Sequence, residues 1–151
     1  MLYKVKIKKV DGLIWRKISN IENDWILSEY VPNFPKRVVV DKDKNNYDIN
    51  LNDNIVVFSK ERPNSIKESR VKFDVKYKKI NGLFWHTIKN CNVDTLMYPE
   101  TKTPIRVFIT DTGERWEIPF LHYEFKFDKN KLLAIQDIME QESGQKIDAI
   151  K

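Results

Sequence analysis

The side chains that could do chemistry in this sequence are chiefly lysines, which recur at alternate positions in two places. Lys4, Lys6 and Lys8 alternate with apolar residues, and Lys76 and Lys78 repeat the pattern seventy positions later. In a β-strand this spacing sets the ammonium groups on one face. A row of cations attracts a polyanion, because phosphate contacts release condensed counterions. The sequence therefore predicts a nucleic-acid-binding surface that draws on Lys4, Lys6, Lys8, Arg16, Lys17, Arg37, Lys76 and Lys78.

These lysines have a second interpretation as the solvated side of an edge strand, where positive charge discourages unwanted strand pairing. The net charge is +5, with 27 basic and 22 acidic residues. Residues 1–70 hold 14 basic and 10 acidic residues, whereas residues 71–128 hold 9 and 8. A basic first half favours an acidic partner, but solubility explains an excess of this size at least equally well.

A metal site has little support in the sequence. Asp41, Asp43 and Asn45 have the spacing that begins an EF-hand calcium loop. Asn46 and Asn52 stand where that loop requires glycine and glutamate, and strands rather than helices are expected on either side. We interpret the segment as an Asx-rich turn, because these side chains cap their own backbone.

Catalytic chemistry has equally little support. His86 and His122 lack a partner at metal-ligand spacing, and no phosphate-binding glycine loop or nucleophile elbow is present. Cys91 is the only cysteine, which excludes an internal disulfide and suits a small buried apolar residue. We therefore expect a protein that is not an enzyme, with no catalytic residues, no metal and no cofactor.

The elements that position these residues come from an internal repeat. The segment Tyr3–Ile21 returns as Phe73–Cys91 with nine identical pairs, among them Gly12/Gly82 and Trp15/Trp85. Each copy predicts a hairpin, because Asp11-Gly12 and Asn81-Gly82 suit a type I′ turn between two alternating runs. A second hairpin is expected over residues 37–49 and 106–118, the latter with a left-handed glycine at Gly113. Closing strands are expected at Ile55–Phe58 and Tyr123–Phe127.

Five short antiparallel strands with one apolar face predict a small barrel or a partly open roll in each copy. We expect a mainly β fold with a first barrel or roll over residues 1–70 and a second over 71–128. A helix and tail over 129–151 should follow, with Asp128 as the helix N-cap. The strand content resembles the SH3-like class, which includes Tudor and KOW modules, although the glycine signature of KOW is absent. One continuous sheet built from both copies is the less favoured arrangement.

The tryptophans divide into two kinds. Trp15 and Trp85 occur in both copies, which favours a place in the core over stacking on bases. Trp25 has no counterpart and lies in a segment of irregular pattern, so it is the candidate for a protein contact. The stretches 22–36 and 92–103 diverge most between the copies and are expected to be loops.

These features predict a non-catalytic binding module that contacts nucleic acid through its lysine faces. The alternative is a protein adaptor or inhibitor, for example a phage accessory or virion protein, that binds through the divergent loops and Trp25. The weakest of the three hypotheses is an enzyme whose site the motifs do not reveal. No apolar run of about 20 residues and no leader segment are present, so we expect a cytoplasmic protein without a membrane partner.

Overall fold

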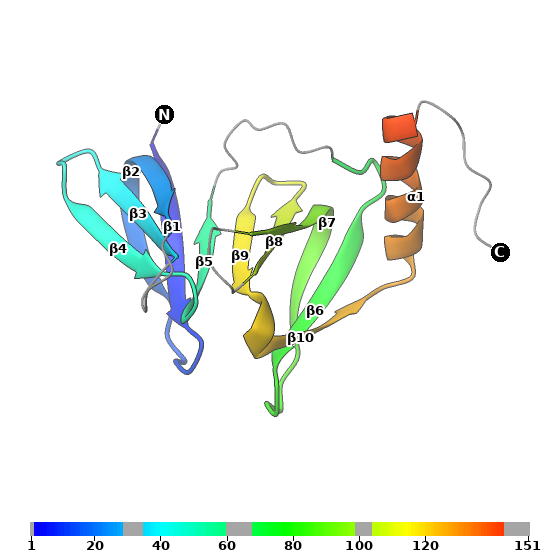
Figure 1. Ribbon diagram of the computed structural model, residues 1–151, viewed down its shortest axis with the longest axis horizontal. Helices are drawn as coiled ribbons and strands as arrows, with labels where there is room; N and C mark the ends of the chain where they lie inside the picture. The colour runs from blue at the N-terminus through cyan, green and yellow to red at the C-terminus, as the bar shows by residue number, and fades with distance from the viewer. Residues whose placement is uncertain (1, 29–34, 60–67, 99–103, 144–151) are drawn as a thin grey trace.

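The computed structural model describes residues 2–28, 35–59, 68–98 and 104–143 (Figure 1). The first half of the chain contains β1 (Tyr3–Lys9), β2 (Arg16–Leu27), β3 (Lys36–Asp41), β4 (Asn46–Asn50) and β5 (Asn54–Phe58). The second half contains β6 (Phe73–Lys79), β7 (His86–Met97), β8 (Ile105–Thr110), β9 (Arg115–Pro119), η1 (Phe120–His122), β10 (Tyr123–Phe127) and α1 (Asn130–Ser143). The expected mainly β fold with one C-terminal helix is confirmed.

All ten strands form one antiparallel sheet, in the order β10-β6-β7-β8-β9-β5-β1-β2-β3-β4. Each half has the same internal order, because β5-β1-β2-β3-β4 is repeated as β10-β6-β7-β8-β9. The halves are joined where β9 pairs with β5, with Val57 opposite Trp116. The sheet does not close into a barrel, and the two halves share one sheet in place of the two separate barrels or rolls that were expected. The less favoured arrangement, a continuous sheet from both copies, is the one observed.

Each of the two cores is built from both halves, which explains why the sheet stays continuous. On β5, Val56 and Phe58 join one core, whereas Ile55 and Val57 join the other. Strand β8 is divided in the same way, with Val107 and Phe108 in different cores. Both strands are therefore buried on two faces, and such strands carry nearly continuous apolar sequences.

The first hairpin of each half is confirmed, but its turn differs from the expected type I′. The amide of Gly12 donates to the carbonyl of Lys9 at 2.9 Å, and Gly82 donates to Lys79 at 2.7 Å. Neither glycine has a positive φ. A Cβ atom on Gly82 would lie 2.9 Å from the carbonyl oxygen of Lys79, so close backbone approach is what requires glycine there. The turn is thus centred one residue earlier than expected.

The long strands β2 and β7 bend at an asparagine in the same place of each copy. Asn20 has a φ of 59° and Asn90 a φ of 58°, next to irregularities in the pairing register. Asparagine tolerates this left-handed conformation better than most residues. Beyond the bend both strands continue into stretches expected to be loops, as far as Leu27 and Met97. The remainder of those loops, residues 29–34 and 99–103, lies outside the described residues.

The second hairpins and the helix cap agree with expectation. Gly113 has a φ of 87° in the turn between β8 and β9, as its Asp-Thr-Gly sequence predicts. The Asp128 carboxylate accepts a hydrogen bond from the amide of Asn130 at 3.1 Å, which caps α1. Gly144 suits a C-terminal helix stop by its residue type, but it lies outside the described residues.

The buried face of α1 is not the stripe that its leucine and isoleucine positions suggest. Ala134 and Asp137 are its buried residues, whereas Leu132, Ile135 and Met139 are exposed. Asp137 accepts hydrogen bonds from the backbone and side chain of Arg70, the latter at 2.9 Å from Nε. These bonds lower the pKa of Asp137 to about 2 and fasten the helix beside the segment that enters β6.

Candidate binding surface at the hairpin end

The four most exposed large apolar side chains among the described residues lie at the tips of the two duplicated hairpins, residues 10–15 and 80–85. Leu13 is 95% exposed and Ile14 is 84% exposed. Their counterparts Leu83 and Phe84 are 85% and 76% exposed. Both loops project at the same end of the molecule (Figure 1, bottom). Large apolar side chains gathered in this way mark an interaction surface more often than chance exposure does.

A tryptophan at the root of each tip anchors the loop and leaves the two preceding residues outside. Trp15 packs edge-on against Trp116 with ring centroids 6.0 Å apart, and the Lys6 ammonium lies 5.5 Å from the Trp15 ring. Trp85 lies between two ammonium groups, those of Lys78 at 5.2 Å and Lys126 at 4.4 Å. Both tryptophans are half-buried, so neither is a fully enclosed core residue.

The two tips are neighbours in space. Lys79 of the second hairpin forms an ion pair with Asp11 of the first, and this bond lowers the pKa of the Asp11 carboxyl. Lys8 Nζ donates to the carbonyl of Gly12 at 3.1 Å. Leu13 and Leu83 line a shared hollow of about 220 Å³. The tips therefore act as one surface with two apolar projections.

Positive charge is concentrated in these hairpins. Residues 3–17 and 73–87 together hold nine basic and two acidic residues, which leaves 18 basic and 20 acidic residues in the rest of the chain. The whole positive excess of the protein therefore resides in the two hairpins. We call this region, with its tips and the lysines of β1, β2 and β6, the hairpin end.

The structure separates the predicted lysine surface into two rows. Lys6 and Lys17 are paired across β1 and β2, and Lys6 also lies opposite Val57, which packs into the core of the second half. Lys76 alternates along β6 with Val75, which belongs to that same core. The row of Lys4, Lys6, Lys8 and Lys17 is consequently on one side of the sheet, and that of Lys76 and Lys78 on the other.

The predicted basic residues differ in their exposure to solvent and in whether they form an ion pair or lie against an aromatic ring. Lys78 pairs with Glu124 at 3.1 Å, and Arg16 lies 5.9 Å from the ring of Tyr47. Among the described residues, Lys4, Lys17 and Lys76 are exposed and form no ion pair. Lys8 is partly buried, and burial together with nearby Lys79 lowers its pKa.

Arg37 does not belong to any exposed surface, because it is 2% exposed. Its Nη1 donates to Asp24 at 3.1 Å and its Nε donates to Glu117 at 3.1 Å. Glu117 comes from β9 of the second half, so this buried network joins the halves beside the β5–β9 pairing. The expectation that Arg37 contacts phosphate is corrected, since a guanidinium so enclosed and paired is not available to a ligand.

Trp25, the predicted protein contact, lies within β2 and not in a loop. It is 40% exposed, and Leu27 two positions further on is exposed on the same strand. Residues two apart on a strand share a face, so these side chains form a small apolar area separate from the tips. The sequence allowed a short strand at Trp25–Leu27 within the expected loop, and the structure shows this segment as the end of the continuous strand β2.

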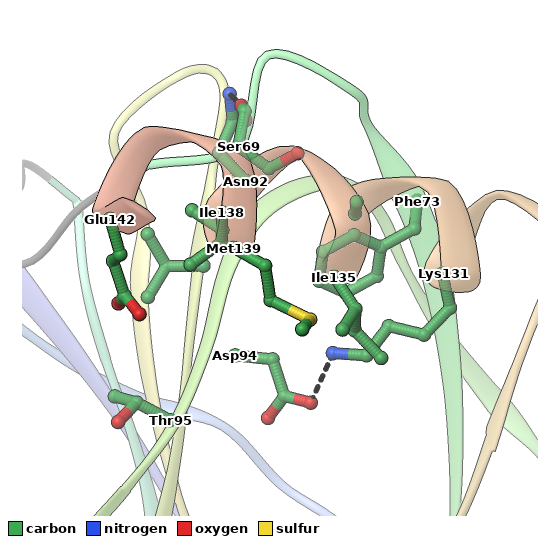
Figure 2. A pocket seen from close by; sticks show the side chains of 12 residues that line it. Ser69, Phe73, Asn92, Asp94, Thr95, Lys131, Ile135, Ile138, Met139 and Glu142 are labelled. Carbon is green, nitrogen blue, oxygen red and sulfur yellow. Dashed lines mark hydrogen bonds and ion pairs between the residues drawn. The ribbon is translucent and has the colours of Figure 1, made fainter. Parts of the chain in front are cut away.

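A cavity of about 460 Å³ lies between α1 and the sheet (Figure 2). Its polar centre is Asp94, which accepts hydrogen bonds from Lys131 Nζ at 2.5 Å and from Arg106 Nε at 2.8 Å. Burial opposes ionisation, but these cationic donors outweigh it and lower the pKa of Asp94. A carboxylate so paired is a weak base, so the arrangement favours a structural role for Asp94.

The remaining candidates for chemistry have structural environments. The Asp41 carboxylate accepts hydrogen bonds from the amides of Asp43 at 2.9 Å and Asn45 at 3.0 Å, the geometry of an Asx turn. Cys91 is fully buried, and burial raises the pKa of its thiol to about 12. Within the described part of the chain, no three His, Cys, Asp or Glu side chains are grouped to hold a metal ion.

Comparison with protein-family models, with curated proteins and with solved structures gives no match. Among the described residues, no helix has the length and apolar character needed to cross a bilayer.

Proposed function

We propose that this protein is a non-catalytic binding module whose hairpin end docks on an anionic partner. The observation that carries the proposal is the distribution of charge, since the two hairpins hold nine basic residues against two acidic ones. Local positive potential raises the concentration of an anionic partner and accelerates its association. The equivalent strand order of the halves suits an origin by duplication of one five-stranded unit of SH3-like type, which would present the surface twice.

Nucleic acid is the first candidate partner. The row of Lys4, Lys6, Lys8 and Lys17 lies on one side of the sheet beside Trp15, and Lys6 is stacked on that ring. Cations that follow a backbone, next to an aromatic ring that accepts a base, are the parts used by single-strand binders without sequence preference. Because Lys76 lies on the other side of the sheet, only the row of the first half would follow a given strand.

Titration of a labelled single-stranded oligonucleotide at two salt concentrations, followed by fluorescence anisotropy, tests this proposal. Binding should weaken steeply with salt, and Lys4→Glu/Lys17→Glu should reduce the slope of log affinity against log salt by about two. Lys42→Glu/Lys129→Glu is the matched control, because it changes net charge equally at exposed positions outside the hairpins. Equal losses in both variants would contradict a site at the hairpin end.

A protein adaptor or inhibitor is the second candidate function. The observation that favours it is the exposed pair of Trp25 and Leu27 on β2, since exposed tryptophans often become the anchors of protein interfaces. This apolar pair lies on β2 and does not belong to the tips. The adaptor function would be favoured if binding to a protein partner were insensitive to salt, lost in Trp25→Ala and kept in Lys4→Glu/Lys17→Glu.

A further inference from the structure

An anionic partner attracted by charge does not explain why apolar side chains are exposed at the tips. Their exposure and shape indicate the kind of partner that they contact. Leu13, Ile14, Leu83 and Phe84 are all at least three-quarters exposed, so most of their apolar surface faces solvent. Ile80 and Leu121 extend the apolar area next to the second tip, where the Ile80 amide donates to the carbonyl of His122 at 3.0 Å. The partner must therefore be the component that takes up these exposed apolar side chains.

The two copies keep apolar character at the tips while changing shape. Leu13 and Leu83 are identical, but Ile14 is replaced by the larger, flat ring of Phe84. A groove on a protein partner discriminates such shapes, since interface cores are packed as tightly as protein interiors. The hydrocarbon of a lipid bilayer takes up isoleucine and phenylalanine alike, because its contribution depends mainly on buried apolar area.

Basic side chains line two hollows beside the apolar tips, although one of them, Lys79, is paired with Asp11. Lys9 and Arg16 line one hollow together with Leu13 and Ile14. Lys8 and Lys79 line the other together with Leu83. Basic side chains next to inserted apolar groups are attracted to anionic headgroups, and each one near the surface strengthens the association.

We infer that the hairpin end binds the surface of an anionic lipid bilayer, with Leu13, Ile14, Leu83 and Phe84 inserted between the lipids. This inference rests on the proposed function, because it names the anionic partner of the same surface. The protein would lie on the membrane without crossing it. The basic residues at the roots of the tips contact the headgroups, and the anchoring tryptophans Trp15 and Trp85 sit at the boundary, where indole rings are favoured.

Co-sedimentation of the full chain with two kinds of vesicle tests the inference. One kind consists of phosphatidylcholine alone and the other of phosphatidylcholine mixed with phosphatidylserine. The protein should bind the mixed vesicles more tightly. Ile14→Glu/Phe84→Glu should weaken that binding by at least about a hundredfold, since two apolar side chains no longer enter the lipid. These residues are exposed, so their replacement leaves the folded core intact.

Leu132→Glu/Leu133→Glu is the matched control, because it replaces two exposed apolar residues outside the hairpins with the same change in charge. It should bind within about threefold of wild type, since its new charges lie on α1 and not on the hairpins. Phosphatidylcholine brominated on its acyl chains should quench the fluorescence of Trp15 and Trp85 in the wild type and not in the tip variant. Equal binding by the tip variant and wild type would overturn the inference.

Two further outcomes separate this inference from the proposed function. Binding to a single-stranded oligonucleotide without binding to mixed vesicles would refute the membrane and leave nucleic acid as the partner. Absence of binding to both at low salt would refute the membrane and the anionic docking surface together.

Discussion

At the scale of single residues, the contrast between Arg37 and the lysines shows how position decides the role of a cation. The lysines at alternate positions of β1 all remain in contact with solvent, with Lys4 exposed and Lys6 and Lys8 partly buried. Arg37 faces the core between the halves, where Asp24 and Glu117 satisfy its guanidinium. A charge so enclosed is tolerated only while its partners remain, because desolvation is no longer compensated once one is removed.

Glu117→Ala should therefore lower the free energy of unfolding by about 3–5 kcal/mol, since it leaves Arg37 buried with half of its partners. Asp48→Ala is the matched control, because Asp48 holds the equivalent place on β4 but is exposed and lies 3.6 Å from Lys36. The control should lose less than about 1 kcal/mol. Urea unfolding followed by tryptophan fluorescence measures both, and similar small losses would show that the buried network does not join the halves.

At the scale of elements, the bends at Asn20 and Asn90 set the curvature of the two long strands. The carbonyl of Asn20 accepts a hydrogen bond from the amide of Lys42, and that of Asn90 accepts one from Asp111, both at 2.9 Å. Each bend thereby connects the first hairpin of its half to the turn of the second. Asparagine is identical at this place in the two copies, because a left-handed backbone excludes most other side chains.

Asn20→Val should cost about 1–2 kcal/mol of stability, since a β-branched residue is strained at a φ of 59°. Asn20→Gly should stay within about 0.5 kcal/mol of wild type, because glycine adopts this conformation freely. Ser19→Val controls for an added apolar group at an exposed neighbouring position. Thermal unfolding compares the three, and a loss in Asn20→Gly as large as in Asn20→Val would contradict a conformational cause.

At the scale of the whole molecule, the repeat made the local elements predictable but not the way they assemble. Strand β10 has the expected bounds Tyr123–Phe127, because alternation and the Asp128 cap are local signals. Closure is a non-local choice: one edge of β5 pairs with β1 of its own half, and the other edge pairs with β9 of the second half. The signal was the unbroken apolar run Ile55–Phe58, which indicates a strand covered by a core on each of its two faces.

The candidate surface was predicted in part for a related reason. Lysine spacing predicts that the cations of β1 share one face, but register across ten strands decides that Lys76 faces the other side. Apolar Leu13 and Ile14 have the composition of a core strand, and only the longer loop that ends at Arg16 puts them outside. Their recurrence in both copies was the available hint of an exposed role.

The central claim is that the duplicated tips enter an anionic membrane surface, and one site-specific fluorescence measurement tests it most directly. Leu83→Cys accepts a polarity-sensitive NBD label while native Cys91 stays unreactive, because burial raises its pKa to about 12. Addition of vesicles that contain phosphatidylserine should shift the NBD emission to the blue and intensify it. The same label at Ser143→Cys, at the end of α1 away from the tips (Figure 1), should not respond. An unchanged spectrum at residue 83, or equal shifts at both positions, would contradict the account.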